Sequence, residues 1–293
     1  MMFTIIIPTY NRGDLITKTI KSCLGQSYSN FELIIIDDGS TDSTEKTIFS
    51  FKDPRIKYFK KENAERGAAR NFGVSKAKGA YITFLDSDDI LYNNHLSHAF
   101  SVIKNNTEIG IFHQAYELVD EKGSVIFKMD HIKKNANKTI IKGNVFSCIG
   151  VFLSSNIIAD IRFSEDRKFS GTEDWLLWLK LAAKYNIIAF NTITSKMIHH
   201  ENRSVLSFDK ELYDYRINYL IKNLYNDDFF MQRFGRKVVN KIKAHMLSYS
   251  SLHAALNKNK FLSTGYIFRS IFTSINELFT KRFLVIIKLL IFK

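Results

Sequence analysis

Short runs of β-branched and aromatic residues alternate with stretches of helical periodicity along the first hundred residues of the chain. Within those stretches, apolar residues recur at the three- and four-residue spacing of an amphipathic helix. This alternation predicts βαβ units and therefore an α/β fold, with a mostly parallel central sheet flanked by helices. The expected strands are residues 3–8, 31–36, 56–59 and 80–85, and the expected helices are residues 13–26, 43–51 and 68–78.

The pattern becomes mixed from about residue 109 and helical throughout after residue 209. A polar, basic stretch over residues 128–142 predicts a loop, and no segment rich in turn residues precedes the helical end. We therefore expect a C-terminal helical extension. The elements expected before it are strands over residues 109–113, 125–127, 187–190 and 193–198, and a helix over residues 174–185.

The composition is that of a folded protein, because 45% of the 293 residues are hydrophobic and only 2 are prolines. This excludes a disordered or collagen-like chain. The cysteines, Cys23 and Cys148, fit neither a disulfide framework nor a zinc site, which suits a reducing compartment. No signal peptide is evident, and no stretch reaches the roughly 20 apolar residues that a membrane-spanning helix needs.

The formal charge of +13 is distributed unevenly along the chain. Residues 235–293 contain 11 Lys and Arg against a single acid, Glu277, whereas residues 1–234 carry a net charge of only +3. A basic segment suggests an anionic membrane or nucleic acid as a partner. Since the aromatic residues lie mostly in core-periodic positions rather than among the basic ones, we expect no nucleic acid partner.

Two neighbouring carboxylates, Asp37 and Asp38, end the second expected strand. A strand–turn–helix junction explains the residues that follow, because Gly39 allows a positive φ and the next Ser, Thr and Asp can cap a helix. It does not explain two carboxylates directly after a buried strand, where an unpaired charge is costly. Ligands of open α/β sheets bind at this strand edge, so a carboxylate here suits a hydrogen bond from a nucleotide base or ribose.

Three acids follow the expected strand 80–85 within four residues: Asp86, Asp88 and Asp89, with Ser87 between the first two. One interpretation is a solvated turn that caps the next helix, which fits Asp89 best. The other is a hard divalent cation, Mg²⁺ or Mn²⁺, held by carboxylate oxygens and by a ligand diphosphate. A cation would relieve the repulsion among the three carboxylates.

Several other charged residues have ordinary interpretations when each is taken alone. Arg66 and Arg70 have two interpretations. Each is an ordinary arginine on the surface or in an ion pair, or it binds a phosphate or the acidic residues nearby. The Glu-Asp pair at residues 173–174 begins a helix, where acids favour the helix dipole. The His-His pair at residues 199–200 follows an expected strand, and such a histidine is more often structural than a ligand.

In their order and spacing, five short elements resemble a family 2 glycosyltransferase of GT-A fold, of the inverting, bacterial polysaccharide type. The resemblance covers roughly residues 3–205 and implies a GT-A catalytic domain over residues 1–206. Its nucleotide-sugar half would span about residues 1–105 and its acceptor half about 106–206, followed by a basic amphipathic helical extension over 207–293. The elements are Pro8-Thr9-Tyr10-Asn11, Asp37-Asp38-Gly39-Ser40, Ala69-Arg70-Asn71, Asp86-Ser87-Asp88 and Glu173-Asp174.

The resemblance also implies roles for individual residues. Asp174 matches the general base, with Glu173 beside it. Asp86 and Asp88 match the ligands of a metal, Mn²⁺ or Mg²⁺, and Asp88 is favoured over Asp86 as the direct ligand. His200, in preference to His199, matches a histidine that approaches the metal and the diphosphate. The residues that match the nucleotide-sugar site, with Asp38 accepting from the base, are Pro8, Thr9, Tyr10, Asn11, Asp37, Asp38, Gly39, Arg66, Arg70, Asp86 and Ser87.

The implied activity is that of a hexosyl- or N-acetylhexosaminyltransferase of cell-surface polysaccharide synthesis. The donor would be a nucleotide-diphosphate sugar, UDP by family frequency, and the acceptor a hydroxyl of a saccharide or lipid-linked molecule. Asp174 would take the acceptor's proton while the metal neutralises the leaving diphosphate, in one displacement that inverts the anomeric configuration. Nothing in the sequence suggests the second, nucleophilic carboxylate of a double displacement.

The basic tail is amphipathic. One interpretation is a helical cap that docks its apolar stripe on the catalytic domain. The other is an interfacial helix whose cations meet anionic headgroups, which predicts a cytoplasmic enzyme, peripheral on the inner face of the cytoplasmic membrane. The apolar stripe consists of Ile267, Phe268, Ile271, Phe272, Ile275, Leu278 and Phe279.

Three other classes of protein fit the sequence less well. A nucleotidyltransferase would carry a Gly-rich loop with basic residues after the first strand, and that loop here has one Arg and one Gly. A non-catalytic nucleotide-sugar binder would not need Asp86, Asp88 and Asp174 together. A nucleic-acid binder is disfavoured because the acid clusters would repel phosphate in the absence of a metal.

Overall fold

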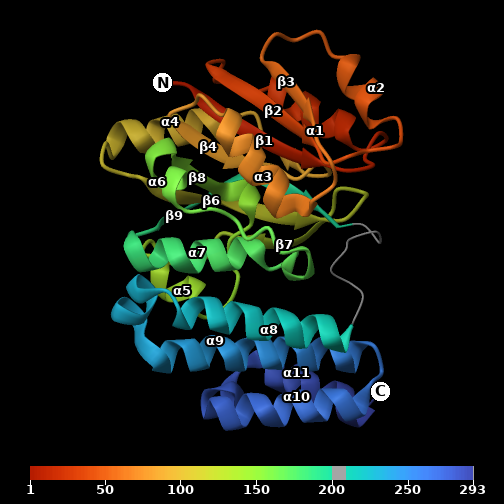
Figure 1. Ribbon diagram of the computed structural model, residues 1–293, viewed down its shortest axis with the longest axis vertical. Coiled ribbons are helices and arrows are strands. Elements are labelled where there is room, and N and C mark those ends of the chain that lie inside the picture. Colours follow the sequence, from red (N-terminus) through yellow and green to blue (C-terminus); the bar gives the residue numbers. More distant parts are fainter. Residues whose placement is uncertain (200–208, 293) are drawn as a thin grey trace.

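One continuous sheet runs through the upper part of the molecule, and stacked helices lie below it (Figure 1). The computed structural model describes residues 1–199 and 209–292. Along the sheet, the strand order is β3-β2-β1-β4-β8-β6-β9-β5, and β7 pairs with β6. The strands are β1 (Phe3–Thr9), β2 (Phe31–Asp37), β3 (Ile56–Lys60), β4 (Tyr81–Phe84), β5 (Ile90–Leu91), β6 (Ile111–Val119), β7 (Val125–Met129), β8 (Val151–Ser154) and β9 (Ile188–Ile198).

The first four strands of that order are parallel, as the βαβ pattern predicts. Both faces of β1 and β2 are buried, which explains their unbroken apolar sequences. Ile6 of β1 lies opposite Ile34 on one side and Phe84 on the other. The connecting helices are α1 (Ile16–Leu24), α2 (Thr44–Phe49) and α3 (Glu65–Lys76).

Close packing of α3 on the sheet depends on a glycine. A Cβ atom at Gly73 would lie 2.5 Å from Cγ2 of Ile6, so only glycine lets the helix approach β1 this closely. The approach carries Arg70, one turn earlier in α3, towards the strand ends where the acids gather.

The other half of the sheet mixes parallel and antiparallel pairs. β8 runs antiparallel to β4 and β6, whereas β9 runs parallel to β6 and antiparallel to β5. The two strands predicted over residues 187–198 form one irregular strand, β9. The loop expected over residues 128–142 is partly wrong, because it contains the short helix α5 (Asn137–Ile140). The polar Asn137 anchors that helix by donating to the carbonyls of Ala182 and Tyr185, each at 2.7 Å.

The remaining helices of this part cover the sheet. The predicted helix over residues 174–185 is confirmed as α7 (Glu173–Lys184), whose apolar face is buried around Trp178. Figure 1 shows α7 between the sheet and the C-terminal helices. The other elements are α4 (His95–Asn105), α6 (Ser155–Asp160) and the 3-10 turns η1 (Cys148–Gly150), η2 (Arg167–Phe169) and η3 (Ile275–Phe279).

The predicted C-terminal helical extension is confirmed. Its longest helix, α9, contacts α7 as well as α8, α10 and α11, and is kinked at Gly235, where φ is 70°. Phe230 and Ile242 of α9 belong to the same apolar cluster as Ile6 of the sheet, so the extension shares the main core. No helix within residues 1–199 and 209–292 is long and apolar enough to cross a membrane. The helices are α8 (Lys210–Tyr225), α9 (Asp228–Leu256), α10 (Lys260–Thr273) and α11 (Lys281–Phe292).

Candidate active site

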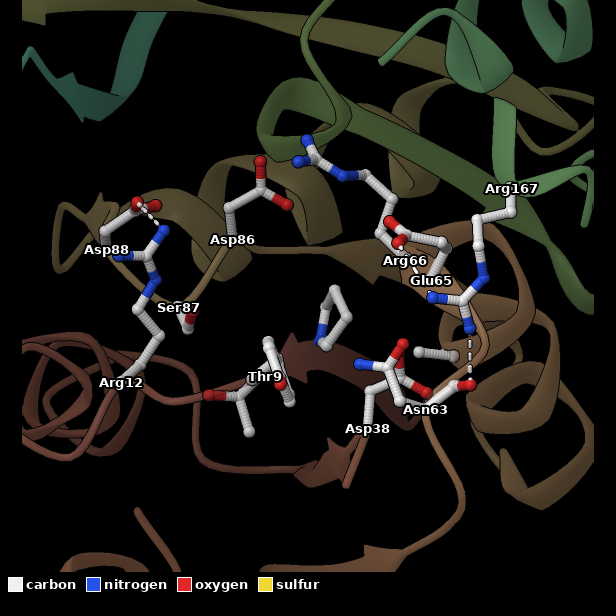
Figure 2. A pocket seen from close by; sticks show the side chains of 13 residues that line it. Thr9, Arg12, Asp38, Asn63, Glu65, Arg66, Asp86, Ser87, Asp88 and Arg167 are labelled. Atoms are coloured by element: carbon white, nitrogen blue, oxygen red, sulfur yellow. Dashed lines mark hydrogen bonds and ion pairs between the residues drawn. The ribbon is translucent and has the colours of Figure 1, made fainter. Parts of the chain in front are cut away.

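Two adjoining cavities lie at the carboxyl ends of the parallel strands. The first has a volume of about 420 Å³ and the second about 480 Å³. Arg66 and Asp86 line both, so the two cavities meet at these side chains. Figure 2 shows the first cavity, with the Arg66 guanidinium pointing toward Asp86. The residues lining the first cavity are Pro8, Thr9, Tyr10, Arg12, Asp38, Asn63, Glu65, Arg66, Ala69, Asp86, Ser87, Asp88 and Arg167.

The end of β1 forms one side of the first cavity. Pro8 and Thr9 are its last strand residues, and Tyr10, which follows them, has 49% of its surface exposed. The Thr9 hydroxyl is buried and has no hydrogen-bond partner among the described residues. A buried polar group needs a partner, so this hydroxyl is well placed for a hydrogen bond to a ligand.

The two carboxylates after β2 have different surroundings. Asp38 lines the first cavity and accepts hydrogen bonds from Lys61 Nζ at 2.7 Å and from the Ala64 amide at 3.0 Å. Asp37 is fully buried, is not part of the cavity lining, and accepts from the Ser40 amide and the Tyr58 hydroxyl, each at 2.7 Å. Asp37 therefore holds the turn, and Asp38 faces the cavity.

Asn11 and Gly39 also lie outside the cavity lining and shape the loops beside it. The Asn11 amide donates to Ser40 Oγ at 2.9 Å, and its side-chain oxygen accepts from the Thr41 amide at 2.9 Å. Gly39 has a φ of 86°, and a Cβ there would lie 3.1 Å from the Asn63 nitrogen. The loops after β1 and β2 are thus tied together beneath the cavity.

The acidic turn after β4 separates into a cavity-facing part and a structural part. Asp86 and Asp88 line the first cavity, and Asp88 Oδ2 lies 3.8 Å from Arg12 Nη2 (Figure 2). Asp89 is buried and accepts from the Ile198 amide at 3.1 Å, which ties the turn to the end of β9. The turn interpretation of the sequence therefore applies to Asp89.

The donor set of Asp86 and Asp88 fits a hard divalent cation. Within the described parts of the chain, no group of three or more His, Cys, Asp or Glu side chains is arranged to hold a metal. Two carboxylates suit Mg²⁺ or Mn²⁺, because such ions keep several water or phosphate ligands. His200 lies outside the described residues. His199 has an exposed side chain, and its amide donates to the Val119 carbonyl at 2.7 Å.

Arg70 joins the two acidic motifs and lines only the second cavity. Its side chain is 2% exposed, with Nη2 donating to Asp86 Oδ1 at 2.8 Å and Nη1 donating to Glu173 Oε1 at 2.7 Å. The guanidinium also lies over the Phe163 ring, 5.3 Å from its centroid. A fork of this kind fixes both carboxylates in one geometry.

The start of α7 places two acids in different roles. Glu173 is buried, and its two carboxylate oxygens accept hydrogen bonds from Arg70 and from the Gly171 amide. Asp174 lines the second cavity and accepts from Asn144 Nδ2 at 3.1 Å to each oxygen. Burial, with the Glu173 charge beside it, raises the pKa of Asp174 to about 6. A carboxylate with such a pKa is a suitable general base near neutral pH.

Several cavity residues are absent from the sequence prediction. Arg167, in η2, reaches into the first cavity, where it donates to the Asn63 carbonyl at 2.7 Å and lies 3.5 Å from Glu65 Oε1 (Figure 2). Arg12 and Trp175 had a local signal, since each directly follows one of the sequence motifs. Asn63 and Glu65 of the first cavity were also not predicted. The remaining unforeseen residues line the second cavity and include Tyr116, Lys142, Asn144, Phe146, Met197, His245, Met246, Tyr249 and Arg282.

Solved structures share this fold. The structure of Staphylococcus aureus TarS residues 1–349 in complex with UDP-GlcNAc superimposes with a TM-score of 0.67 at 18% identity, covering 95% of this chain and 91% of that one. The mannosyltransferase PcManGT of Pyrobaculum calidifontis, in complex with GDP-Man and Mn²⁺, gives a TM-score of 0.56 at 15% identity, covering 98% of this chain and 85% of that one. The GT-A fold is thereby confirmed.

Sequence relatives lead to the same group of enzymes. An uncharacterized glycosyltransferase of Rickettsia conorii is 31% identical over 92% of this chain, which spans only 45% of that relative's length. The beta-1,3-glucosyltransferase WfgD of Escherichia coli is 35% identical over 65% of this chain and 73% of its own length. A beta-1,3-glucosyltransferase of Campylobacter jejuni is 29% identical over 93% of this chain and 89% of its own. The family model described as glycosyl transferase family 2 matches residues 4–155, and the chain belongs to that family of glycosyltransferases.

Proposed function

We propose that the protein is an inverting transferase that moves a hexosyl or N-acetylhexosaminyl group from a UDP-sugar to a hydroxyl of a lipid-linked saccharide. The observation that carries the proposal is the junction of two cavities at Asp86, with Asp174 on the far side of that junction. A donor in the first cavity and an acceptor in the second would meet between these two carboxylates. The donor half then corresponds to about residues 1–105 and the acceptor half to about 106–206.

The first cavity would hold the nucleotide and its diphosphate. Asp38 and the unsatisfied Thr9 hydroxyl offer hydrogen bonds to the base and ribose, while Arg66 offers a cation to the phosphates. Asp86 and Asp88 would hold Mn²⁺ or Mg²⁺, with His200 as a further proposed ligand, and the ion would neutralise charge on the leaving diphosphate. Asp37, Gly39 and Asn11 contribute by fixing the loops.

Transfer would proceed in one displacement. The acceptor oxygen forms a bond to the anomeric carbon, and the bond from that carbon to the diphosphate oxygen breaks. The hydroxyl proton passes to Asp174, and the nucleoside diphosphate leaves. Attack from the side of the second cavity, opposite the leaving group, inverts the configuration.

Glu173 and Arg70 act on this step by position. Glu173 is bonded to Arg70, which in turn holds Asp86. The Arg70 guanidinium thereby fixes the position of the proposed metal ligand, Asp86, relative to the start of α7, where the proposed base Asp174 lies. The negative charge of Glu173 also contributes to the raised pKa of Asp174.

Lipid-linked acceptors are supported by the names of relatives. The Escherichia coli relative is named a UDP-Glc:alpha-D-GlcNAc-diphosphoundecaprenol beta-1,3-glucosyltransferase, and the Campylobacter jejuni relative a GalNAc(5)-diNAcBac-PP-undecaprenol beta-1,3-glucosyltransferase. Both names describe a saccharide on a polyprenyl diphosphate. We propose an acceptor of this class for the present chain, in cell-surface polysaccharide synthesis.

The last helices offer a surface that suits an anionic bilayer. Part of the predicted stripe packs inward, since Ile267 is only 4% exposed, but Phe272 and Phe279 are 88% and 85% exposed. Exposed lysines and an arginine flank these rings, in a segment with a single acid. We propose that this face docks on the inner leaflet of the cytoplasmic membrane. The exposed cations are Lys258, Lys260, Arg269, Lys281 and Lys288.

Vesicle flotation tests the docking. We expect binding to vesicles of anionic phospholipid that falls as salt rises, and loss of binding in a Phe272→Ser, Phe279→Ser double variant. The exposed Phe49, on α2, provides the matched control as Phe49→Ser. Equal binding by all three proteins, or dimerisation of the wild type that the double variant abolishes, would remove the bilayer as the occupant of this face.

The transferase activity is tested by incubation with a panel of nucleotide sugars, Mn²⁺ or Mg²⁺ and a polyprenyl-diphosphate-linked saccharide. We expect metal-dependent release of nucleoside diphosphate with one sugar, and loss of transfer in Asp174→Asn while donor binding persists. The exposed Glu121→Gln is the control. Binding of no nucleotide sugar by the wild type would overturn the proposal, and unchanged turnover in Asp174→Asn would remove Asp174 as the base.

A further inference from the structure

The C-terminal helices form one wall of the second cavity. His245, Met246 and Tyr249 of α9 and Arg282 of α11 line it together with Asp174. The His245 ring lies 5.7 Å from the Trp175 ring, centroid to centroid, so α9 touches the residue next to the proposed base. The wall is therefore part of the acceptor site and not a distant cap.

Arg282 is a cation of this wall that forms no ion pair within the described residues. Burial lowers its pKa, and the charge of Glu277 acts in the opposite direction. Its Nη1 donates to the His245 carbonyl at 3.2 Å and to Ser248 Oγ at 3.0 Å, and its guanidinium lies over the Tyr249 ring at 5.6 Å. The nearby His245 is neutral, because burial and the Arg282 charge lower its pKa to about 3.

A second cation borders the same part of the cavity. Lys142 lines the cavity and is exposed, and the next residue, Gly143, packs against His245. A Cβ at Gly143 would lie 2.9 Å from His245 Nε2, which itself lies 3.2 Å from Arg282 Nη2. Gly143 and Arg282 thus both approach the imidazole ring of His245.

Asp174 lines the same cavity as Arg282 and Lys142, and aromatic rings line it as well. Such rings suit the apolar faces of sugars, whereas an arginine and a lysine suit a phosphate. A sugar joined to a phosphate matches this combination of side chains. The aromatic rings are Tyr116, Phe146, Trp175 and Tyr249.

We infer that Arg282, together with Lys142, binds a phosphate group of the acceptor and thereby sets which acceptor hydroxyl meets Asp174. The inference rests on the proposed function and names the feature by which the site selects acceptors. The phosphate belongs either to a polyprenyl diphosphate directly attached to the reacting sugar or to a phosphodiester elsewhere in a saccharide. The Leu284 and Val285 side chains, exposed on the same helix, would lie beside a lipid chain leaving the cavity.

The test compares two acceptors that share one saccharide, a short-chain polyprenyl diphosphate and an octyl glycoside. We expect Arg282→Gln to raise the KM for the diphosphate acceptor by about tenfold or more, as loss of a charge-assisted hydrogen bond does. The KM values for the octyl glycoside and for the donor should stay within about twofold. Arg282→Lys should recover part of the loss, and Arg236→Gln, an exposed arginine on α9, is the control.

Lys142→Gln keeps the test valid if Arg282→Gln fails to fold, because Lys142 is exposed. It should also raise the KM for the diphosphate acceptor selectively. Equal losses with both acceptors, or none with either, would overturn the inference while leaving transferase activity in place. A saccharide with an internal phosphodiester and an octyl aglycone separates the two phosphate sources, since selective loss with that substrate assigns the phosphodiester. If the wild type transfers to no acceptor, the proposed function itself fails.

Discussion

The two cavities are built in contrasting ways. The first is formed mainly by residues at or just after the ends of β1, β2 and β4, together with the start of α3, and charged side chains of both signs line it. The second is formed by the 142–148 segment, the start of α7 and helices from the far end of the chain, and it has more apolar and aromatic lining. The proposed donor side therefore depends on the parallel sheet, whereas the proposed acceptor side depends on how the C-terminal helices dock.

The contrast teaches where specificity can vary. Strand ends of a buried parallel sheet hold their positions tightly, so a nucleotide site built on them is preorganised. The acceptor side can change with a few residues on α9 and α11 while the donor side stays the same. The link between the two sides is Arg70, which is bonded to Asp86 and to Glu173.

Removing the Arg70 side chain should have the largest effect on stability and on transfer. Arg70→Gln would leave Asp86 and the buried Glu173 without their shared cation, which lowers the free energy of unfolding by about 3–5 kcal/mol. Chemical denaturation measures this loss, and transfer should fall with it. Arg55→Gln removes a partly exposed ion pair with Asp53 and should cost under about 1 kcal/mol. Similar losses in both variants would contradict the role given to Arg70.

On the donor side, Asp88→Asn should reduce turnover at least about 100-fold, because loss of charge neutralisation at the diphosphate costs several kcal/mol of transition-state stabilisation. The variant should also need more Mn²⁺ or Mg²⁺ for half-maximal rate, as a metal titration would show. Asp89→Asn, in the same turn but facing β9, should lower stability and leave the metal dependence unchanged. If the wild type, Asp88→Asn and Asp89→Asn showed the same metal dependence, Asp88 would not be a metal ligand.

On the acceptor side, the rate should follow the ionisation of Asp174. Since the base acts deprotonated and its pKa is raised to about 6, kcat/KM should fall roughly tenfold per pH unit below that value. Asn144→Ala removes a hydrogen bond to the charged form, so the acidic limb should move to higher pH. A pH profile of kcat/KM for the wild type and the variant measures both effects. If the acidic limb stayed at the same pH in the variant, Asn144 would not influence the pKa of the base.

The smallest effect concerns the docking of the C-terminal wall. Gly143→Ala would push against His245, because the added Cβ would lie 2.9 Å from Nε2. We expect a roughly fivefold rise in the acceptor KM with an unchanged donor KM, since small overpacking shifts neighbours rather than unfolding the chain. Gly143 has a φ of 157°, so alanine there also strains the backbone. Gly123→Ala, with a φ of 88° and nothing within 4 Å, is the control for that strain, and Gly265→Ala on α10 is the control for an added methyl group alone. A changed donor KM would contradict the separation of the two sides.

The sequence predicts for a physical reason that residues of the first cavity lie close together. Its motifs come directly after buried strands, and parallel strands end at one edge, so Thr9, Asp38 and Asp86 converge without further information. The sequence does not reveal which neighbour faces the cavity. Asp37 and Asp38 are adjacent carboxylates, and only the turn geometry shows that Asp37 bonds to Tyr58 and the Ser40 amide.

The acceptor wall could not be predicted, because nothing local connects its parts. Lys142 lies in a polar segment, Trp175 follows the Glu-Asp pair, and Arg282 belongs to a helix whose composition indicates only a basic amphipathic surface. These residues come together only because α9 packs against α7. The tail's apolar periodicity was informative, yet it could not show that one side packs inward while Phe272 and Phe279 face outward.

The stereochemistry of the product shows whether transfer is a single displacement across the junction of the two cavities. With the donor on one side of the junction and Asp174 on the other, a single displacement on an α-linked UDP-sugar should give a β-linked product. Proton NMR of the purified product reports the anomeric coupling constant and distinguishes the two linkages. A β-linkage is the expected result, and an α-linkage would contradict the proposal, because one displacement from the side opposite the leaving group cannot retain the configuration.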